Sequence, residues 1–228
     1  MSTYTHTLFL NDIDVNNVKI IFELGSRDLV DAIKMKDVYT KSSVYAFECN
    51  PESVIQCEKN LVGTSDIVLV KKAVSITDGP CSFFPFDRSK YDNVGASSLL
   101  LKDFSTHSKS DPDYNKENPQ YEVVVDGTRI DTFCKEHNIS NIDLLCIDLQ
   151  GYELNALKSM GDYIKNVKYI ITELSICPTY KGGARAIDVI QFLSENGFTY
   201  TSSIQYGYDF PNFDVTGFSE FDALFVKN

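Results

Sequence analysis

Acidic side chains stand at the ends of four apolar segments, and their positions indicate a common site. Each of these segments has the composition of a buried strand and ends on or beside one carboxylate, namely Glu23, Glu48, Asp148 and Glu173. Carboxylates are costly to bury unless they are paired or hydrogen-bonded. In open α/β sheets, ligands bind in the crevice beyond the carboxyl ends of the strands. We therefore expect these carboxylates to line one ligand site.

The segment 143–153 is the most informative of the four. Its apolar run ends on the lone carboxylate Asp148, and a helical pattern follows over 152–160. An almost continuous apolar run is typical of a strand that is buried on both faces of a parallel sheet. Asp148 is then expected at the ligand-binding edge, with Gln150 and Glu153 just behind it. The alternative interpretation is a helix cap that only satisfies free backbone N–H groups.

The alternation of strands and helices predicts the fold class. Strands are expected at 18–24, 43–48, 67–74, 142–148, 167–174, 198–204 and 221–226, and helices at 28–37, 51–61, 130–137, 152–160 and 184–196. Strands that alternate with helices in this way are typical of α/β folds. We predict one doubly wound, mostly parallel sheet with helices on both faces. The whole chain, residues 1–228, is expected to be a single domain.

Two stretches interrupt this pattern. Residues 1–17 are polar and rich in turn formers, so we expect a loosely attached lead-in. Residues 77–120 are expected to form an insert, with short strands at 81–86 and 96–101 as a hairpin. Residues 105–120 are polar and without periodicity, and long loops of this kind are usually functional or disordered. The insert therefore predicts a mobile loop beside the site.

Composition excludes several classes of partner. The chain has 21 Lys and Arg against 32 Asp and Glu, a net charge of −11, and no basic cluster, which disfavours nucleic acid. No segment has the roughly twenty apolar residues of a membrane span, and residues 1–6 lack a signal-peptide pattern. The six cysteines are scattered without a C-x-x-C pair, which is typical of reduced thiols and makes zinc improbable. A cytoplasmic protein is expected.

The first strand and Glu48 predict the kind of cofactor. Gly25 follows the first strand as in nucleotide-binding turns, but Arg27 and Val30 stand where the later glycines of G-x-G-x-x-G would be. This disfavours NAD, whose pyrophosphate needs that turn. Glu48 stands about 25 residues after Glu23, the spacing of an acid that binds ribose hydroxyls. An adenosine ligand without phosphates fits best, and S-adenosylmethionine adds a cation that suits acidic surroundings.

Four segments resemble motifs of the FkbM family of S-adenosylmethionine-dependent methyltransferases. They occur in the family's order over about 20–174, and they read IFELGSRD (21–28), VYAFECNP (44–51), GASSL (95–99) and IDLLCIDLQGYE (142–153). The family usually has lysine at Cys146, glutamate at Gln150, aspartate at Glu23 and a second glycine at Leu29. The resemblance implies a Rossmann-like class I methyltransferase that methylates a hydroxyl of a sugar, glycan or other small molecule.

The resemblance also implies site roles. Asp148 is expected to act as the general base or to hold the methionine amino group, and Glu173 and Glu153 are second candidates for catalysis. Glu48 is expected to hold the ribose. The other expected cofactor-binding residues are Glu23, Gly25 and Ser26 at the methionine end, Ala73 and Val74 near the adenine, and Cys49 and Ser98. No metal is expected to take part.

Two alternatives stay open. One is an NAD-dependent oxidoreductase of the same sheet class. The other is a ligand-binding protein that has lost activity on a methyltransferase scaffold, which the departures at Gln150 and Leu29 suggest. The two closing strands are expected to be able to mediate a homodimer. The sequence does not identify the acceptor.

Overall fold

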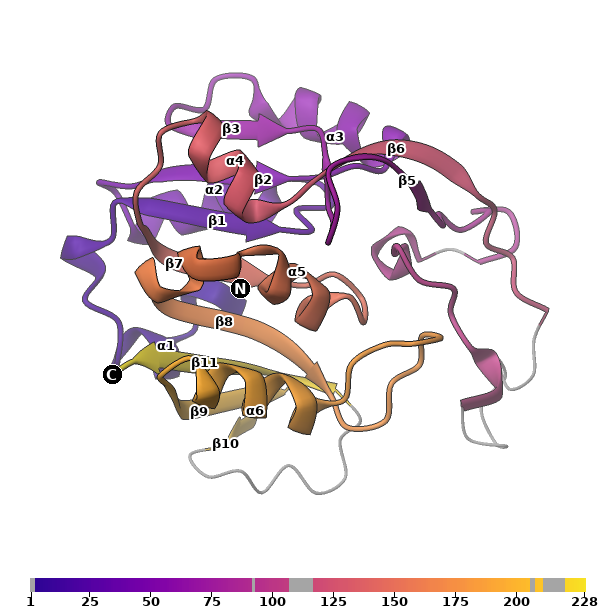
Figure 1. Ribbon diagram of the computed structural model, residues 1–228. Coiled ribbons are helices and arrows are strands. Elements are labelled where there is room, and N and C mark those ends of the chain that lie inside the picture. Colours follow the sequence, from indigo (N-terminus) through magenta and orange to yellow (C-terminus); the bar gives the residue numbers. More distant parts are fainter. Residues whose placement is uncertain (1–2, 92, 107–116, 206–207, 211–219) are drawn as a thin grey trace.

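An eight-stranded sheet forms the centre of the computed structural model, which describes residues 3–91, 93–106, 117–205, 208–210 and 220–228. The strand order is β10-β9-β11-β8-β7-β1-β2-β3 (Figure 1). The parallel strands are β1 (Ile20–Leu24), β2 (Ser43–Phe47), β3 (Ile67–Val70), β7 (Ile142–Ile147) and β8 (Val167–Ser175). The antiparallel strands are β9 (Phe198–Gln205), β10 (Tyr208–Phe210) and β11 (Glu220–Lys227). The predicted doubly wound, mostly parallel α/β sheet is confirmed.

The strand order reverses between β1 and β7, which makes this position the topological switch point of the sheet. From β1 the chain proceeds to β2 and β3 on one side, and it returns to place β7 and β8 on the other. Ligands bind at such a switch point in doubly wound sheets. Both closing strands, β9 and β11, lie inside the sheet rather than at its edge. The described strands thus put the ends of β1 and β7 side by side.

Helices cover one face of the sheet, and helices together with the amino-terminal segment cover the other. The first layer contains α4 (Ile130–Glu136), α5 (Glu153–Ser159) and α6 (Ala186–Glu195), which pack with Phe22 and Leu145 (Figure 1). The second contains α2 (Val30–Val38) and α3 (Pro51–Leu61), which pack with Ile21 and Leu144. Since successive strand residues point to opposite faces, burial on both faces explains the continuous apolar runs.

The prediction of a loosely attached lead-in is wrong. The amino-terminal segment consists of η1 (Thr3–Thr5), α1 (Thr7–Leu10) and η2 (Val15–Asn17). Tyr4, Phe9 and Ile13 are buried in the core between this segment and the sheet. Three large apolar side chains outweigh the polar residues around them, because each one buried stabilises the fold by about 1.5–3 kcal/mol. The segment therefore forms part of the second layer.

The predicted third strand and the predicted hairpin also differ from the structure. Residues 67–74 form two strands, and the second, β4 (Ala73–Val74), joins a separate three-stranded sheet of order β4-β6-β5. In that sheet β5 (Gly79–Phe83) pairs with β6 (Val123–Thr128), a partner about 40 residues away. The expected partner of β5, residues 96–101, contributes a single bridge from Ser98 to Phe84. Long-range pairing of this kind leaves no local signal in the sequence.

The rest of the insert docks on the loop between β8 and α6. It includes η3 (Val94–Ala96) and η4 (Phe104–Thr106), while η5 (Gly161–Asn166) precedes β8. Lys102 bridges to Tyr180, and the Asp103 backbone N–H donates to the Thr179 carbonyl at 2.7 Å. Most of the predicted mobile loop, residues 107–116, lies outside the described residues. The described part of the insert forms one wall beside the carboxyl ends of the strands.

Two expectations about cysteines and membranes can be compared with this fold. All six cysteines are described, and each is a free thiol. Among the described residues, no helix has the length and apolar character needed to cross a membrane.

Candidate active site

A pocket opens at the carboxyl ends of β1, β2 and β7. It encloses about 890 Å³ of empty space including its mouth, which lies within the range of roughly 300–1,000 Å³ usual for small-molecule sites. The structure brings all nine residues expected to bind the cofactor to this pocket, namely Glu23, Gly25, Ser26, Glu48, Cys49, Ala73, Val74, Ser98 and Asp148. The other two expected site residues, Glu153 and Glu173, line a small adjoining pocket.

At Gly25 the backbone that follows β1 lies directly against the backbone that follows β7. The φ of Gly25 is +90°, and a Cβ built on it would lie 1.9 Å from the carbonyl oxygen of Asp148. The Asp148 backbone N–H donates to the Leu24 carbonyl at 3.0 Å, which joins the two strand ends. Only glycine permits both this φ and this approach. The turn therefore brings the Asp148 backbone against the floor of the pocket.

Leu29 explains the missing second glycine. Its φ is +66°, so it adopts the left-handed conformation that glycine usually provides. This conformation costs a residue with a side chain roughly 1–2 kcal/mol. Leu29 is fully buried, and burying a leucine stabilises the fold by a similar amount. The turn thus keeps a left-handed backbone at this position without the glycine.

Glu48 is held in place by backbone donors. Its Oε2 accepts a hydrogen bond from the Arg27 N–H at 2.8 Å, and its Oε1 accepts one from the Asn50 N–H at 2.7 Å. Burial raises the pKa of Glu48 to about 7, although these hydrogen bonds lower it. Each carboxylate oxygen can accept a second hydrogen bond. A fixed pair of acceptors at the end of β2 suits a ligand with two neighbouring hydroxyls.

Glu23 lies at the base of the same pocket. Its side chain is 1% exposed, and its Oε2 accepts a hydrogen bond from the Ser26 hydroxyl at 2.5 Å. Burial raises the pKa of Glu23 to about 8, against the opposing effect of the Ser26 hydrogen bond. Such a carboxylate is stabilised in its ionised form by a bound cation. Glu23 therefore favours a cationic group in the pocket.

The pKa of Glu23 predicts a pH-dependent stability for the ligand-free protein. The unfolded chain loses this proton near pH 4.5 and the folded protein only near pH 8, so stability is full below 4.5 and falls as the pH rises through 8. Glu23→Gln should raise the melting temperature by on the order of 5 °C at pH 8, and by much less at pH 5. Thermal unfolding across this pH range measures the effect. An equal rise at both pH values, or the same rise in the exposed-site control Glu58→Gln, would contradict it.

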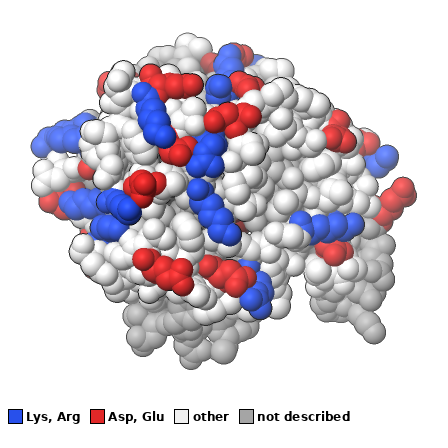
Figure 2. Space-filling model, in the orientation of Figure 1, with Lys and Arg blue, Asp and Glu red and all other residues white. Residues whose placement is uncertain are grey.

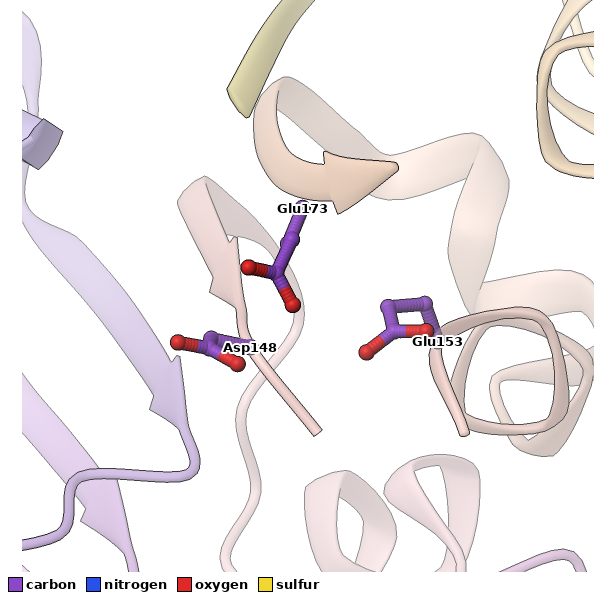
Figure 3. A group of neighbouring side chains, drawn as sticks. All are labelled: Asp148, Glu153 and Glu173. Carbon is purple, nitrogen blue, oxygen red and sulfur yellow. The ribbon is translucent and has the colours of Figure 1, made fainter. Parts of the chain in front are cut away.

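Three carboxylates converge behind Asp148. Asp148, Glu153 and Glu173 come from the end of β7, the first turn of α5 and the end of β8, and they point toward a shared space (Figure 3). One oxygen of each lies within 4.8 Å of the others. Together they could offer three oxygen ligands to a cation, an arrangement that the sequence analysis did not predict. The expectation that no metal takes part stays a prediction.

Gln150 lies between two of these carboxylates. Its amide Nε2 donates to Asp148 Oδ1 at 2.7 Å and to Glu173 Oε2 at 3.2 Å. Its Oε1 lies 2.9 Å from the hydroxyl of Tyr180, which is also 2.6 Å from the Ala96 carbonyl oxygen and donates its one hydrogen to these two acceptors. The amide supplies two N–H donors where the usual family glutamate would add a fourth carboxylate.

Asp148 and Glu173 lie so close together that their two carboxyl groups cannot both be ionised. Burial raises the pKa of Glu173 well above its ordinary value, and the negative charge of Asp148 raises it further. Burial also raises the pKa of Asp148, but the Gln150 hydrogen bond lowers it. Like charges this close leave one proton on the pair. Glu173 holds that proton, and Asp148 is the ionised member.

Glu153 braces the turn that carries Asp148. It is 5% exposed, although it belongs to the first turn of a helix. Its Oε1 accepts hydrogen bonds from the backbone N–H groups of Leu149 and Gly151, both at 3.0 Å. Burial raises its pKa to about 7. The backbone contacts hold the segment 148–151 in a fixed conformation beside the pocket.

Sequence reasoning did not assign Tyr4 and Tyr180, which line the pockets, or Asp222, a carboxyl group near them. Tyr4 lines the main pocket from the amino-terminal segment, and Tyr180 lines the small one. Asp222 of β11 pairs with Glu173 across the sheet, and burial together with the charge of Asp148 raises its pKa to about 7. Asp222 stands two residues before the apolar Leu224, so both lie on the same face of a strand. This spacing was a usable signal that Asp222 lies on a covered face of the sheet. No pattern distinguished the two tyrosines from core aromatics.

Comparison with known proteins identifies the family. Residues 29–200 match the family described as Methyltransferase FkbM domain. The chain is similar to 2-O-methyltransferase NoeI of Sinorhizobium fredii, with 24% identity over 167 residues. That alignment covers 72% of this chain and 66% of the relative.

Solved structures share the fold at low identity. The precorrin-6y C5,15-methyltransferase of Geobacter metallireducens has a TM-score of 0.50, with 10% identity over 96% of this chain and 86% of that one. The fibrillarin pre-rRNA processing protein of Methanococcus jannaschii also has a TM-score of 0.50, with 10% identity over 94% of this chain and 69% of that one. Such similarities concern the fold alone, and they confirm the Rossmann-like methyltransferase architecture. Since the family match covers most of the chain, this protein belongs to the FkbM family of methyltransferases.

Proposed function

We propose that the protein is an S-adenosylmethionine-dependent O-methyltransferase that acts on a hydroxyl of a small molecule, sugar or glycan. The observation that carries the proposal is Glu48, which two backbone N–H groups fix at the end of β2 so that it faces the pocket. Family membership supports methyl transfer, and the 2-O-methyltransferase relative supports oxygen as the acceptor atom.

The residues of the pocket fit this cofactor. Glu48 would accept hydrogen bonds from the ribose hydroxyls, with Ala73 and Val74 beside the adenine and Cys49 and Ser98 completing the wall. Glu23 and the turn of Gly25 and Ser26 would hold the cationic methionine end. When bound, S-adenosylmethionine supplies an electrophilic methyl group on a sulfonium. The acidic surroundings favour that positive charge.

The carboxylate pair would handle the acceptor proton. An alcohol oxygen loses its proton as it attacks a methyl group, so a positioned base accelerates the reaction. Asp148 is the ionised member of the pair, and the Gln150 amide fixes the direction of its carboxylate. Glu173 would remain protonated beside it, and Glu153 would hold the turn. Most of the rate should come from alignment of acceptor and methyl group in a closed site.

The acceptor is proposed to be small rather than a nucleic acid. On the face shown in Figure 2, Lys and Arg side chains are interspersed with Asp and Glu instead of forming a basic patch. The net charge of −11 also opposes a phosphate backbone. A homodimer and a cytoplasmic location stay predictions.

Glu48→Ala tests the cofactor assignment. The variant should weaken binding of S-adenosylmethionine and S-adenosylhomocysteine by at least about tenfold, because a charged hydrogen-bond acceptor is lost. Titration calorimetry with both ligands and with NAD measures this, and Glu58→Ala, an exposed change on α3, is the matched control. Binding of NAD alone would favour the oxidoreductase. No binding by the wild type would reject the enzyme proposal, and binding without turnover in an acceptor screen would favour a ligand-binding protein.

A further inference from the structure

The amino-terminal segment places a tyrosine at the cofactor pocket. Tyr4 belongs to η1, is 7% exposed and lines the pocket together with Glu23, Ser26 and Asp148. The family match begins at residue 29 and does not include this segment. Tyr4 is therefore a feature of this chain that requires its own explanation.

The contacts of η1 fix Tyr4 in this position. The hydroxyl of the fully buried Tyr39 donates to the Tyr4 carbonyl oxygen at 3.2 Å. The Thr3 side chain is hydrogen-bonded to Asp222 on β11. Phe9 and Ile13 anchor the following residues in the core. Tyr4 is thus held from both sides rather than resting on the surface.

The Tyr4 hydroxyl lies among carboxylates of one sheet face. The amino-terminal segment covers one face of the sheet, and this face carries Glu23, Cys146 and Asp222. Each of the three stands two residues from a buried apolar residue of the same face. Burial raises the pKa of Tyr4 well above its ordinary value, and the charges of Asp148 and Glu23 add to this effect. The hydroxyl therefore stays protonated and acts as a hydrogen-bond donor. The described part of the chain provides no hydrogen-bond partner for it.

Four donors of the turn that follows β1 already have acceptors. The N–H groups of Gly25 and Ser26 both donate to the Phe47 carbonyl, at 3.1 and 2.9 Å. The Ser26 hydroxyl donates to Glu23, and the Arg27 N–H donates to Glu48. A methionine end carries a carboxylate as well as an ammonium group. In a pocket lined by acidic side chains, that carboxylate needs a neutral or cationic donor.

We infer that Tyr4 closes the methionine end of the pocket and donates a hydrogen bond to the carboxylate of the bound cofactor. The inference rests on the proposed function. Glu23 and Asp148 would then attract the ammonium group, while the Tyr4 hydroxyl recognises the group of opposite charge. The amino-terminal segment acts as a specificity element that distinguishes the complete cofactor from adenosine fragments.

Tyr4→Phe tests this role because it removes the hydroxyl and keeps the buried ring. Titration calorimetry would compare three ligands: S-adenosylhomocysteine, its decarboxylated analogue and 5′-methylthioadenosine. The variant should bind S-adenosylhomocysteine about tenfold more weakly and bind the two ligands without a carboxylate within about twofold of the wild type. Tyr45→Phe, which removes a hydroxyl on the opposite face of the sheet, is the control and should change none of the three affinities.

The possible outcomes separate this inference from the proposed function. Unchanged binding of S-adenosylhomocysteine by Tyr4→Phe would overturn the inference and leave the cofactor assignment intact. An equal loss for all three ligands would also overturn it, since Tyr4 would then only pack the pocket. A wild type that binds none of the ligands would overturn the proposed function and this inference with it. Equal melting temperatures of variant and wild type would establish that both are folded.

Discussion

Asp148→Asn should lower kcat by roughly 10²–10⁴-fold, the range expected for loss of a positioned general base. Asparagine has the shape of aspartate, so the Gln150 contact at the end of β7 can be kept by rotation of either amide. It cannot accept a proton from the acceptor hydroxyl. Release of S-adenosylhomocysteine with an acceptor found by screening measures the rate, and calorimetry measures cofactor affinity. A base predicts a large loss of kcat with a Kd changed by less than about tenfold.

Glu173→Gln is the matched control for this prediction. Glu173 already carries the shared proton in our assignment, and glutamine resembles a protonated glutamate. The control should therefore lose less than about tenfold in kcat, and its rate should rise over the same pH range as that of the wild type, because one neutral neighbour of Asp148 replaces another. The opposite order of effects would make Glu173 the base. A weakened Kd with unchanged kcat would assign Asp148 to the methionine amino group instead.

The strand ends are the part of the site that the sequence predicted well. Buried parallel strands read as continuous apolar runs, and a carboxylate that interrupts such a run is conspicuous. This is why Glu23, Glu48 and Asp148 could be placed at one edge of the sheet, and the structure brings all three to one pocket. Their shared face follows from alternation along each strand, which is a local property of the chain.

Features that depend on distant parts of the chain could not be predicted. The partner of β5 is β6, and the intervening residues give no indication of that pairing. Tyr4 stands in a polar stretch, and only the apolar face formed by Val44, Leu144 and Ile171 explains its burial. The bridging role of Gln150 likewise requires β7 and β8 to lie side by side. In each case tertiary contacts, rather than local propensity, decide the conformation.

Gly25→Ala should disrupt both the fold at the switch point and cofactor binding. The new Cβ would overlap the Asp148 carbonyl oxygen at 1.9 Å, and backbone at this position cannot move without separating β1 from β7. The left-handed φ of +90° adds roughly 1–2 kcal/mol, and overlap in a packed region typically adds about 1–3 kcal/mol more. At ~2–4 °C per kcal/mol in a chain of this size, the melting temperature should fall by roughly 5–20 °C.

Gly79→Ala separates the two causes of this loss. Gly79 has a φ of +94°, almost that of Gly25, but a Cβ on it would meet no atom within 4 Å. It should therefore show the conformational cost alone, a fall of roughly 2–8 °C, and should bind S-adenosylhomocysteine normally. Thermal unfolding and calorimetry of the two variants measure the difference. Equal losses in both would mean that the contact between Gly25 and Asp148 does not limit the site. A larger fall in melting temperature for Gly25→Ala, together with loss of binding, would show that the switch point requires a residue without a Cβ at position 25.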